Sequence, residues 1–193
     1  MTKLTELREE LHACRNCELY RDATQAVFSV GRASATVMLV GEQPGDREDL
    51  EGEPFVGPAG HVLDEALEQA GIARSDVYLT NAVKHFRFER RGKRRIHEKP
   101  AVSHIEACHP WLEAELAVVR PRVVVCLGAT AGRSVLGRPV KVTQERGRPL
   151  DVDAPYEVVV TTHPSALLRL RDRGDYAGEL RRLADDLAVA AAL

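Results

Sequence analysis

The sequence lacks the features that would mark a membrane protein or an exported one. No apolar run approaches the ~20 residues that a membrane-spanning helix needs. The first ten residues, MTKLTELREE, contain no apolar stretch of the kind found in signal peptides. The chain also contains no internal repeat and no low-complexity linker. We therefore expect a single domain over residues 1–193, located in the cytoplasm and without a membrane partner.

The chain has little net charge, so its overall composition does not point to nucleic acid. The totals are 27 Lys and Arg against 29 Asp and Glu, a formal net charge of −2. The charges are unevenly distributed, however, because the stretch from Lys84 to Lys99 holds eight Lys or Arg and two Glu. Such a local excess is typical of a segment that binds phosphate groups, with a solvated surface loop as the alternative.

Two common phosphate-binding motifs are absent, although a long glycine-rich loop is present. The loop runs from Gly41 to Gly60, GEQPGDREDLEGEPFVGPAG, and follows the apolar run TVMLV. It has neither the GK[ST] ending of a Walker A motif nor the GxGxxG of a dinucleotide-binding turn. Loops between a strand and a helix usually have ~2–6 residues, and longer ones are often functional. We therefore predict an active-site loop, with a long solvated connection as the alternative.

Short apolar runs alternate with helical patterns along the chain, which predicts an α/β fold with a mainly parallel sheet. Apolar residues at helical spacing predict a first helix over residues 2–13 and a last helix that contains Tyr176 and Leu187. Buried strands are predicted at residues 36–40, 77–80, 122–127 and 158–161.

Polar residues follow three of these strands, and parallel strands bring such residues to one edge of a sheet. Glu42 follows the first strand, Asn81 the second and His163 the fourth, while Asp46 and Phe55 lie in the long loop. A planar base would fit this set. Phe55 offers a stacking face, Asn81 a donor and an acceptor, and His163 a hydrogen bond to a carbonyl group. None of these residues is specific alone, so the prediction depends on their convergence.

Cysteine is scarce, with four residues, and two of them form the sequence Cys14-Arg15-Asn16-Cys17. A redox pair with this spacing normally follows a strand and opens a helix, whereas this pair follows a predicted helix. We interpret it as half of a metal site, with two ordinary thiols as the alternative. Cys108 lies on the inner face of a predicted helix. Cys126 lies in a predicted strand and is interpreted as a small core residue.

Three segments resemble the motifs of the uracil-DNA glycosylase superfamily: GEQPGDREDLEGEPFVGPAG, TNAVKH and THPSALL. Within it, the chain is similar to the iron–sulfur family 4 enzymes. More narrowly it resembles the UdgX group, because Gln43 replaces a glycine of the first motif and because the segment from Lys93 to His97, KRRIH, is inserted. The resemblance covers nearly the entire chain. It implies a three-layer αβα domain with a central, mainly parallel four-stranded sheet.

The resemblance also implies roles for individual residues. Glu42 would stabilise positive charge on the sugar, and His97 would attack the sugar carbon and stay bonded to the DNA. The implied catalytic residues are His97, Glu42 and His163. The residues implied to bind uracil are Gln43, Asp46, Phe55, Asn81 and His163. Those implied to contact DNA are Lys93, Arg94, Arg95, Ser165, Leu167 and Leu168, where either leucine would fill the gap left by the flipped nucleotide.

An iron–sulfur cofactor is implied as well. Family 4 enzymes hold a four-iron cluster with four cysteines, and this chain has Lys84-His85 where they have Lys-Cys. The implied ligands of a 4Fe-4S cluster are Cys14, Cys17, His85 and Cys108. Three cysteines and one histidine also suit zinc, which is the alternative.

The implied activity is excision of uracil from single-stranded or duplex DNA by a monomer, followed by a permanent bond between His97 and the abasic sugar. Turnover would then be close to zero. Two other interpretations remain, an ordinary uracil glycosylase with multiple turnover and a non-catalytic iron–sulfur or zinc module that binds DNA. Assays for a covalent adduct and for turnover separate the three.

Overall fold

A five-stranded sheet forms the centre of the domain in the computed structural model, which describes residues 3–171 and 174–193. The strand order is β2-β1-β5-β7-β6. Four strands run parallel: β1 (Val37–Gly41), β2 (Val77–Asn81), β5 (Val123–Leu127) and β7 (Glu157–Thr161). Every residue of β1, β2 and β5 is buried, as expected for strands covered on both faces.

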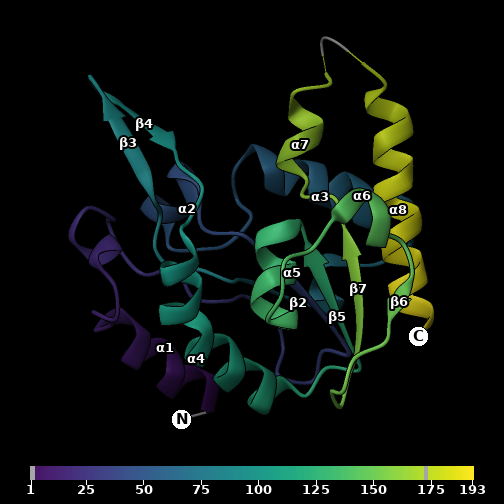
Figure 1. The fold of residues 1–193 in the computed structure, drawn as a ribbon, viewed down its shortest axis with the longest axis horizontal. Helices are drawn as coiled ribbons and strands as arrows, with labels where there is room; N and C mark the ends of the chain where they lie inside the picture. The colour runs from purple at the N-terminus through teal and green to yellow at the C-terminus, as the bar shows by residue number, and fades with distance from the viewer. Residues whose placement is uncertain (1–2, 172–173) are drawn as a thin grey trace.

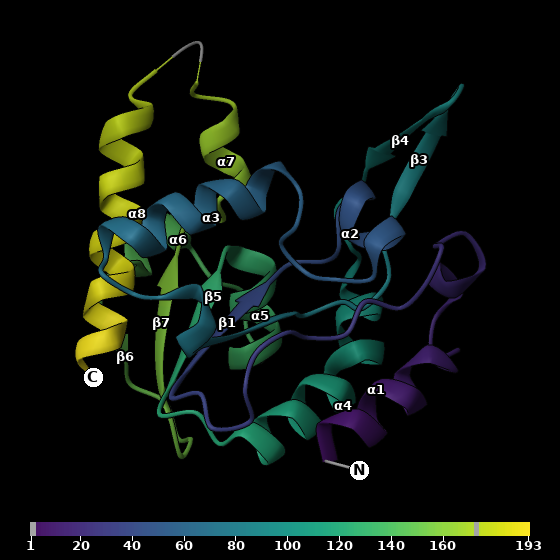
Figure 2. The same cartoon turned by 180° about the vertical axis from the view of Figure 1, so that it is seen from behind.

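Helices cover the two faces of the sheet and complete three layers (Figures 1 and 2). Successive residues of a strand point to opposite faces. Leu39 of β1 accordingly packs in the core beneath α3 (Pro58–Gln69) and α8 (Tyr176–Ala192). Met38 packs in the second core, with residues of α4 (Val102–Val119) and α5 (Ala129–Leu136). The predicted αβα architecture is confirmed. The N-terminal helix α1 (Lys3–His12) packs against α4.

The predicted number of strands is wrong, because a fifth strand joins the sheet. It is β6 (Pro149–Leu150), which pairs antiparallel with β7 at the edge. Two residues are too few to give an alternating pattern in the sequence. A proline has no N–H to donate to the hydrogen-bond ladder, so within a sheet it is confined to positions such as this edge strand.

The basic segment is a β-hairpin rather than an irregular loop. β3 (Phe88–Arg91) and β4 (Arg94–His97) pair antiparallel, with Phe88 opposite His97 and Arg90 opposite Arg95. Gly92 in the turn has a φ of 59°, which glycine adopts without strain.

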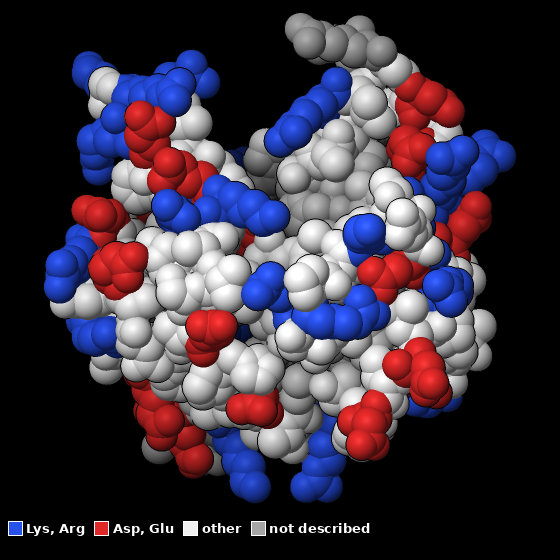
Figure 3. All heavy atoms as spheres, in the orientation of Figure 1, with Lys and Arg blue, Asp and Glu red and all other residues white. Residues whose placement is uncertain are grey.

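The hairpin and the short helix α7 (Ser165–Leu168) project from the carboxyl-terminal end of the sheet (Figures 1 and 2). The surface between the two projections is hollowed, and Lys and Arg cover much of the hairpin (Figure 3). The shorter elements are η1 (Glu18–Arg21), α2 (Asp46–Glu51), η2 (Arg74–Asp76) and α6 (Val142–Glu145). Within the described ranges, no helix combines the length and apolarity that crossing a membrane requires.

Candidate active site

Glu42 follows β1 directly, and its carboxylate contacts the hairpin. Its Oε1 lies 3.3 Å from Nε2 of His97, and its Oε2 accepts a hydrogen bond from the hydroxyl group of Thr130 in α5. Burial alone would raise the pKa of Glu42, but the hydrogen bonds from His97 and Thr130 outweigh it and keep this pKa below its usual range. Glu42 is therefore a fixed carboxylate, and the His97 side chain beside it is 49% exposed.

His163 follows β7, and its surroundings select one tautomer. The backbone N–H of Ser165 donates to Nδ1 at 3.2 Å, and the Ser165 hydroxyl group lies 2.8 Å from the same nitrogen. In a neutral ring, a nitrogen that accepts an N–H carries no proton, so Nε2 carries it. Burial lowers the pKa of His163 to about 4, so the ring is neutral at physiological pH. Nε2 is thus a donor.

Phe55 and Asn81 lie close to the same strand end. The ring of Phe55 stacks with that of His163, with centroids 6.3 Å apart and an interplanar angle of 30°. Asn81 ends β2 and is buried. A Cβ atom on Gly41 would lie 2.3 Å from Oδ1 of Asn81 and 2.6 Å from the ring of Phe55. Glycine at this position therefore lets an aromatic ring and an amide group approach one strand end.

The long loop is held in place by one of its own carboxylates and by Arg74 of η2. The carboxylate of Glu48 accepts hydrogen bonds from the backbone of Gly45 at 3.1 Å and of Gly57 at 2.8 Å. Phe55 has a φ of 58°, which is unfavourable for a residue with a side chain. Its carbonyl group accepts a hydrogen bond from Arg74 at 3.0 Å, which supports this conformation. These contacts hold the loop against the domain, and its role as an active-site loop stays a prediction.

The side chain of Gln43 binds the base of the hairpin. It donates to the carbonyl groups of Arg87 at 3.1 Å and Glu98 at 3.0 Å, and it accepts from the N–H of Arg87 at 3.1 Å. Arg87 precedes β3 and Glu98 follows β4, so one buried amide group holds both ends of the hairpin.

Asp46 and Arg95, predicted to contact uracil and DNA respectively, are paired with each other. The guanidinium group of Arg95 forms ion pairs with Asp46 and with the buried Asp49, and its side chain is only 12% exposed. It also lies over the rings of Phe86 and Phe88. In this arrangement Arg95 fastens the hairpin to α2.

The other residues predicted to contact DNA lie on the two projections. Lys93 and Arg94 are exposed on the hairpin. Ser165 hydrogen-bonds His163, as described above. Leu167 is 1% exposed and packs in the core with α3 and α8, whereas Leu168 is only partly buried. Leu168 is thus the more accessible of the two leucines that were predicted to fill the gap.

The four predicted metal ligands are not gathered into one coordination group. Among the described residues, no three or more His, Cys, Asp or Glu side chains are placed to hold a metal ion. Two of the four do meet: a hydrogen bond with Cys108 lowers the pKa of Cys17 to about 6. The sulfur of Cys14 instead accepts a hydrogen bond from the indole N–H of Trp111, at 3.3 Å. Trp111 lies on α4, one turn after Cys108.

The side chain of His85 contains a buried nitrogen that a bound metal would satisfy. Its side chain is buried, and its Nδ1 has no hydrogen-bond partner in the described part of the chain. Buried polar groups are rarely left without one. Three thiols and an imidazole can bind an iron–sulfur cluster or zinc. The chemistry of the four side chains therefore fits either group. Cys126, predicted to be a core residue, is fully buried in β5.

Comparison with known proteins identifies the family. Residues 28–188 match the family described as the uracil DNA glycosylase superfamily. The chain belongs to this superfamily. It is 39% identical over 176 residues to a type-4 uracil-DNA glycosylase of Thermotoga maritima, covering 91% of this chain and 85% of that protein. It is 33% identical over 193 residues to a type-4 uracil-DNA glycosylase of Archaeoglobus fulgidus, covering 96% and 94%.

Sequence reasoning missed two contributors to the site of this superfamily member. Thr130 holds Glu42, and the glycine before its helix, Gly128, lies against His163, where a Cβ atom would be 3.1 Å from that of the histidine. Both follow β5, so the rule that pointed to the ends of the other parallel strands applies to them. The role of the Gln43 side chain had no signal in the sequence, because its partners are backbone groups.

Proposed function

We propose that this protein excises uracil from DNA and then captures the abasic sugar through His97. The observation that carries the proposal is the 3.3 Å contact between His97 and Glu42, which puts an imidazole ring beside the carboxylate at the end of β1. The names of the relatives, type-4 uracil-DNA glycosylases, support the excision step. The sequence features shared with the UdgX group, Gln43 and the KRRIH segment, support the capture step.

Binding requires the uracil nucleotide to leave the base stack, at a cost of a few kcal/mol. Stacking on Phe55 would return ~1–3 kcal/mol. Asn81 offers a donor and an acceptor to the edge of the base. The Nε2–H group of His163 is a neutral donor for a uracil carbonyl oxygen, on which negative charge grows as the bond to the sugar lengthens.

Excision breaks the bond between uracil and the sugar, and the electron pair leaves with uracil. The sugar carbon becomes cationic, and the carboxylate of Glu42 stabilises it. One ring nitrogen of His97 then donates its lone pair to this carbon and forms the new bond. The proton on the other ring nitrogen can pass to Glu42, and from there to uracil or to solvent. The product is an N-linked imidazole.

We also propose that Cys14, Cys17, His85 and Cys108 hold a 4Fe-4S cluster, with zinc as the alternative. When bound, the cluster would cross-link the N-terminal segment to α4 and to the turn after β2. The unpartnered Nδ1 of His85 and the contact between Cys17 and Cys108 support this set of ligands. We propose that the protein acts as a monomer, on uracil in single-stranded or duplex DNA.

The test of capture is denaturing gel electrophoresis after mixing the protein with uracil-containing single-stranded DNA. We expect a one-to-one complex that survives heat and detergent. The His97→Ser variant should form no complex and should release uracil with turnover, because Glu42, Asn81, Phe55 and His163 remain. The matched control is His61→Ser, which changes an exposed histidine on α3 and should still form the complex.

Two results would overturn the capture step. A wild-type protein that turns over freely without a shifted band is an ordinary glycosylase. A His97→Ser variant that still cross-links has its nucleophile elsewhere, with His163 or Glu42 as candidates. A protein that binds DNA but releases no uracil, in the wild type and in every variant, would contradict the excision step as well.

A further inference from the structure

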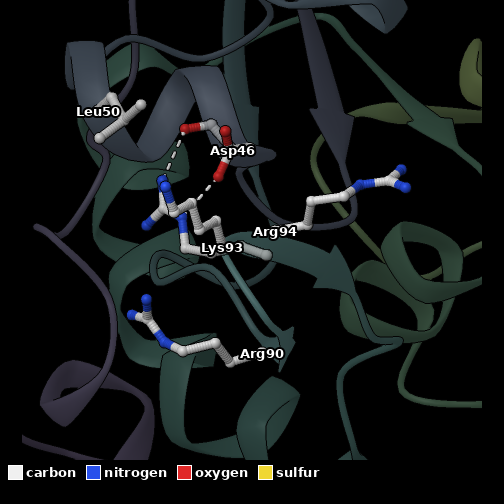
Figure 4. Close-up of a pocket in the computed structure, with 6 residues that line it drawn as sticks. Asp46, Leu50, Arg90, Lys93 and Arg94 are labelled. Atoms are coloured by element: carbon white, nitrogen blue, oxygen red, sulfur yellow. Dashed lines mark hydrogen bonds and ion pairs between the residues drawn. The ribbon is translucent and has the colours of Figure 1, made fainter.

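A groove runs between α2 and the hairpin (Figure 4). Its volume is about 530 Å³. Leu50 of α2 lies on one side of it and is 58% exposed, the largest value for a big apolar side chain in the described ranges. The residues that line the groove are Asp46, Leu50, Arg90, Lys93, Arg94 and Arg95.

The groove has more positive than negative charge. Arg95 is neutralised by Asp46 and Asp49. Arg90, Lys93 and Arg94 are exposed and form no ion pair with any residue that the structure describes. Exposed cations that have no carboxylate partner remain available to an anionic ligand.

The pairing of the hairpin connects the groove to the candidate active site. Opposite residues of antiparallel strands share a face, as do alternate residues of one strand. The register therefore puts Arg90, Arg95 and His97 on the same face of the hairpin. Arg91 lies on the other face, where it pairs with Glu89 at 2.8 Å. Arg95 and His97 are two residues apart along β4, ~7 Å, and Arg90 lies directly across from Arg95 on β3.

We propose that this groove is a second nucleic-acid subsite, which binds the single strand that flanks the excised nucleotide. Arg90 and Lys93 bind its phosphate groups, and Leu50 packs on an unstacked base. The proposal rests on the proposed function for the position of the excised nucleotide, at His97. The exposed leucine favours a single strand over a duplex, because an apolar side chain can pack on a base only where that base has left the stack.

Binding is tested by fluorescence anisotropy with oligonucleotides in which thymine replaces uracil, so that the measurement does not depend on excision. Single strands of increasing length are compared with the corresponding duplexes. The variants are Arg90→Ala, Lys93→Ala and Leu50→Ser. The matched control is Arg91→Ala, which removes the same charge from the next residue of β3 on the opposite face. Thermal unfolding checks that each variant is folded.

We expect Arg90→Ala and Lys93→Ala each to weaken binding of the longer single strands by about tenfold and to reduce the salt slope by about one. Leu50→Ser should weaken binding of single strands more than of duplexes. Arg91→Ala should leave binding of both unchanged. Equal losses in the Arg90 and Arg91 variants, or affinity that does not depend on strand length, would overturn the subsite.

Failure of the subsite and failure of the proposed function are distinguishable. A protein that forms the covalent complex with uracil-containing DNA but shows no difference between the Arg90 and Arg91 variants retains the proposed function and loses the subsite. A protein that shows this difference but neither releases uracil nor cross-links to DNA retains a single-strand binding groove and loses the proposed function.

Discussion

Gln43 and Arg87 hydrogen-bond each other reciprocally, side-chain amide to backbone amide, at 3.1 Å in both directions. A further bond from Gln43 to the carbonyl group of Glu98 joins the other end of the hairpin to the same side chain. Gln43 directly follows Glu42 in the chain. The residue beside the carboxylate thus binds both ends of the hairpin that carries His97, while Arg95 holds the same hairpin to α2.

The Gln43→Ala variant should separate excision from capture. It removes three hydrogen bonds and leaves the residues that surround the base in place, so uracil release should persist. The hairpin loses the contacts at its base and keeps those of Arg95, and we expect the adduct formed per uracil released to fall by about tenfold, equivalent to ~1.4 kcal/mol, or about one net hydrogen bond. Quantifying free uracil and the shifted gel band in the same reaction measures this ratio.

Gln144→Ala, in the distant helix α6, is the control and should not change the ratio. Gln43→Glu provides an intermediate case, because a carboxylate can accept from the backbone N–H of Arg87 but cannot donate to either carbonyl group. An unchanged ratio in Gln43→Ala would show that the position of His97 does not depend on this side chain.

A buried ion pair between Lys84 and Glu115 lies behind the turn that follows Asn81. Both side chains are fully buried and lie 2.6 Å apart, and Tyr78 and Thr80 also donate to the carboxylate. Replacing Glu115 with Gln would leave the ammonium group of Lys84 buried without a counter-charge. We expect the free energy of unfolding to fall by about 3–5 kcal/mol.

Urea denaturation measures this loss. The control is Glu51→Gln, which breaks an exposed i,i+4 pair with Arg47 and should cost no more than about 1 kcal/mol. The double variant Lys84→Met with Glu115→Leu should be more stable than Glu115→Gln, because no uncompensated charge remains. Equal losses in Glu115→Gln and Glu51→Gln would contradict the assigned cost of burying a lone charge.

The parallel strands and the residues at their ends could be predicted from the sequence. Fully buried strands appear as short apolar runs, and the polar residue after each run, such as Glu42, Asn81 and His163, is then assigned to one edge of the sheet. Local sequence patterns are sufficient to assign these strands and the residues at their ends, because the assignment depends only on burial and on the order of the strands in the chain.

Long-range pairing could not be predicted in this way. The count of cations between Lys84 and Lys99 treated all of them as surface charges, but Lys84 is buried against Glu115, 31 residues further along the chain. Arg95 forms ion pairs with Asp46 and Asp49 and is therefore not a free surface charge. The hairpin was missed because its strands carry charged residues on both faces and show no apolar alternation.

The composition of the proposed metal site gives a further prediction. We expect about four iron and four sulfide ions per chain, with the broad visible absorbance of an iron–sulfur protein. Cys108→Ser should lose iron, sulfide and absorbance, whereas Cys126→Ser should retain them, since Cys126 lies within the core at β5. Elemental analysis with acid-labile sulfide determination measures both. One zinc per chain without iron would contradict the cluster and favour the zinc alternative.

The pH dependence of excision should reflect the neutral state of His163. The His97→Ser variant isolates this step, because its uracil release does not include capture. Burial lowers the pKa of His163 from 6.5 to about 4, so the ring stays neutral from pH 8 down to about pH 5.5 and the single-turnover rate should not change because of it. Below that range Nδ1 gains a proton and can no longer accept the N–H of Ser165, so the ring loses the contact that orients it. The rate should therefore fall as the pH approaches 4.

The same shift affects stability, with a sign that follows from proton binding. The unfolded chain takes up the proton near pH 6.5 and the folded chain only near pH 4, so between these values the unfolded state binds more protons. The free energy of unfolding of the wild-type protein should fall as the pH is lowered through this window. That of the His163→Gln variant should fall less steeply. Urea unfolding at pH 7 and pH 4.5 measures both slopes. Two results together would contradict this assignment: an excision rate that drops around pH 6.5 in the His97→Ser variant, and the same change of unfolding free energy with pH in the wild type and in His163→Gln. They would show that His163 titrates like a solvated histidine and that its ring is not held as a neutral donor.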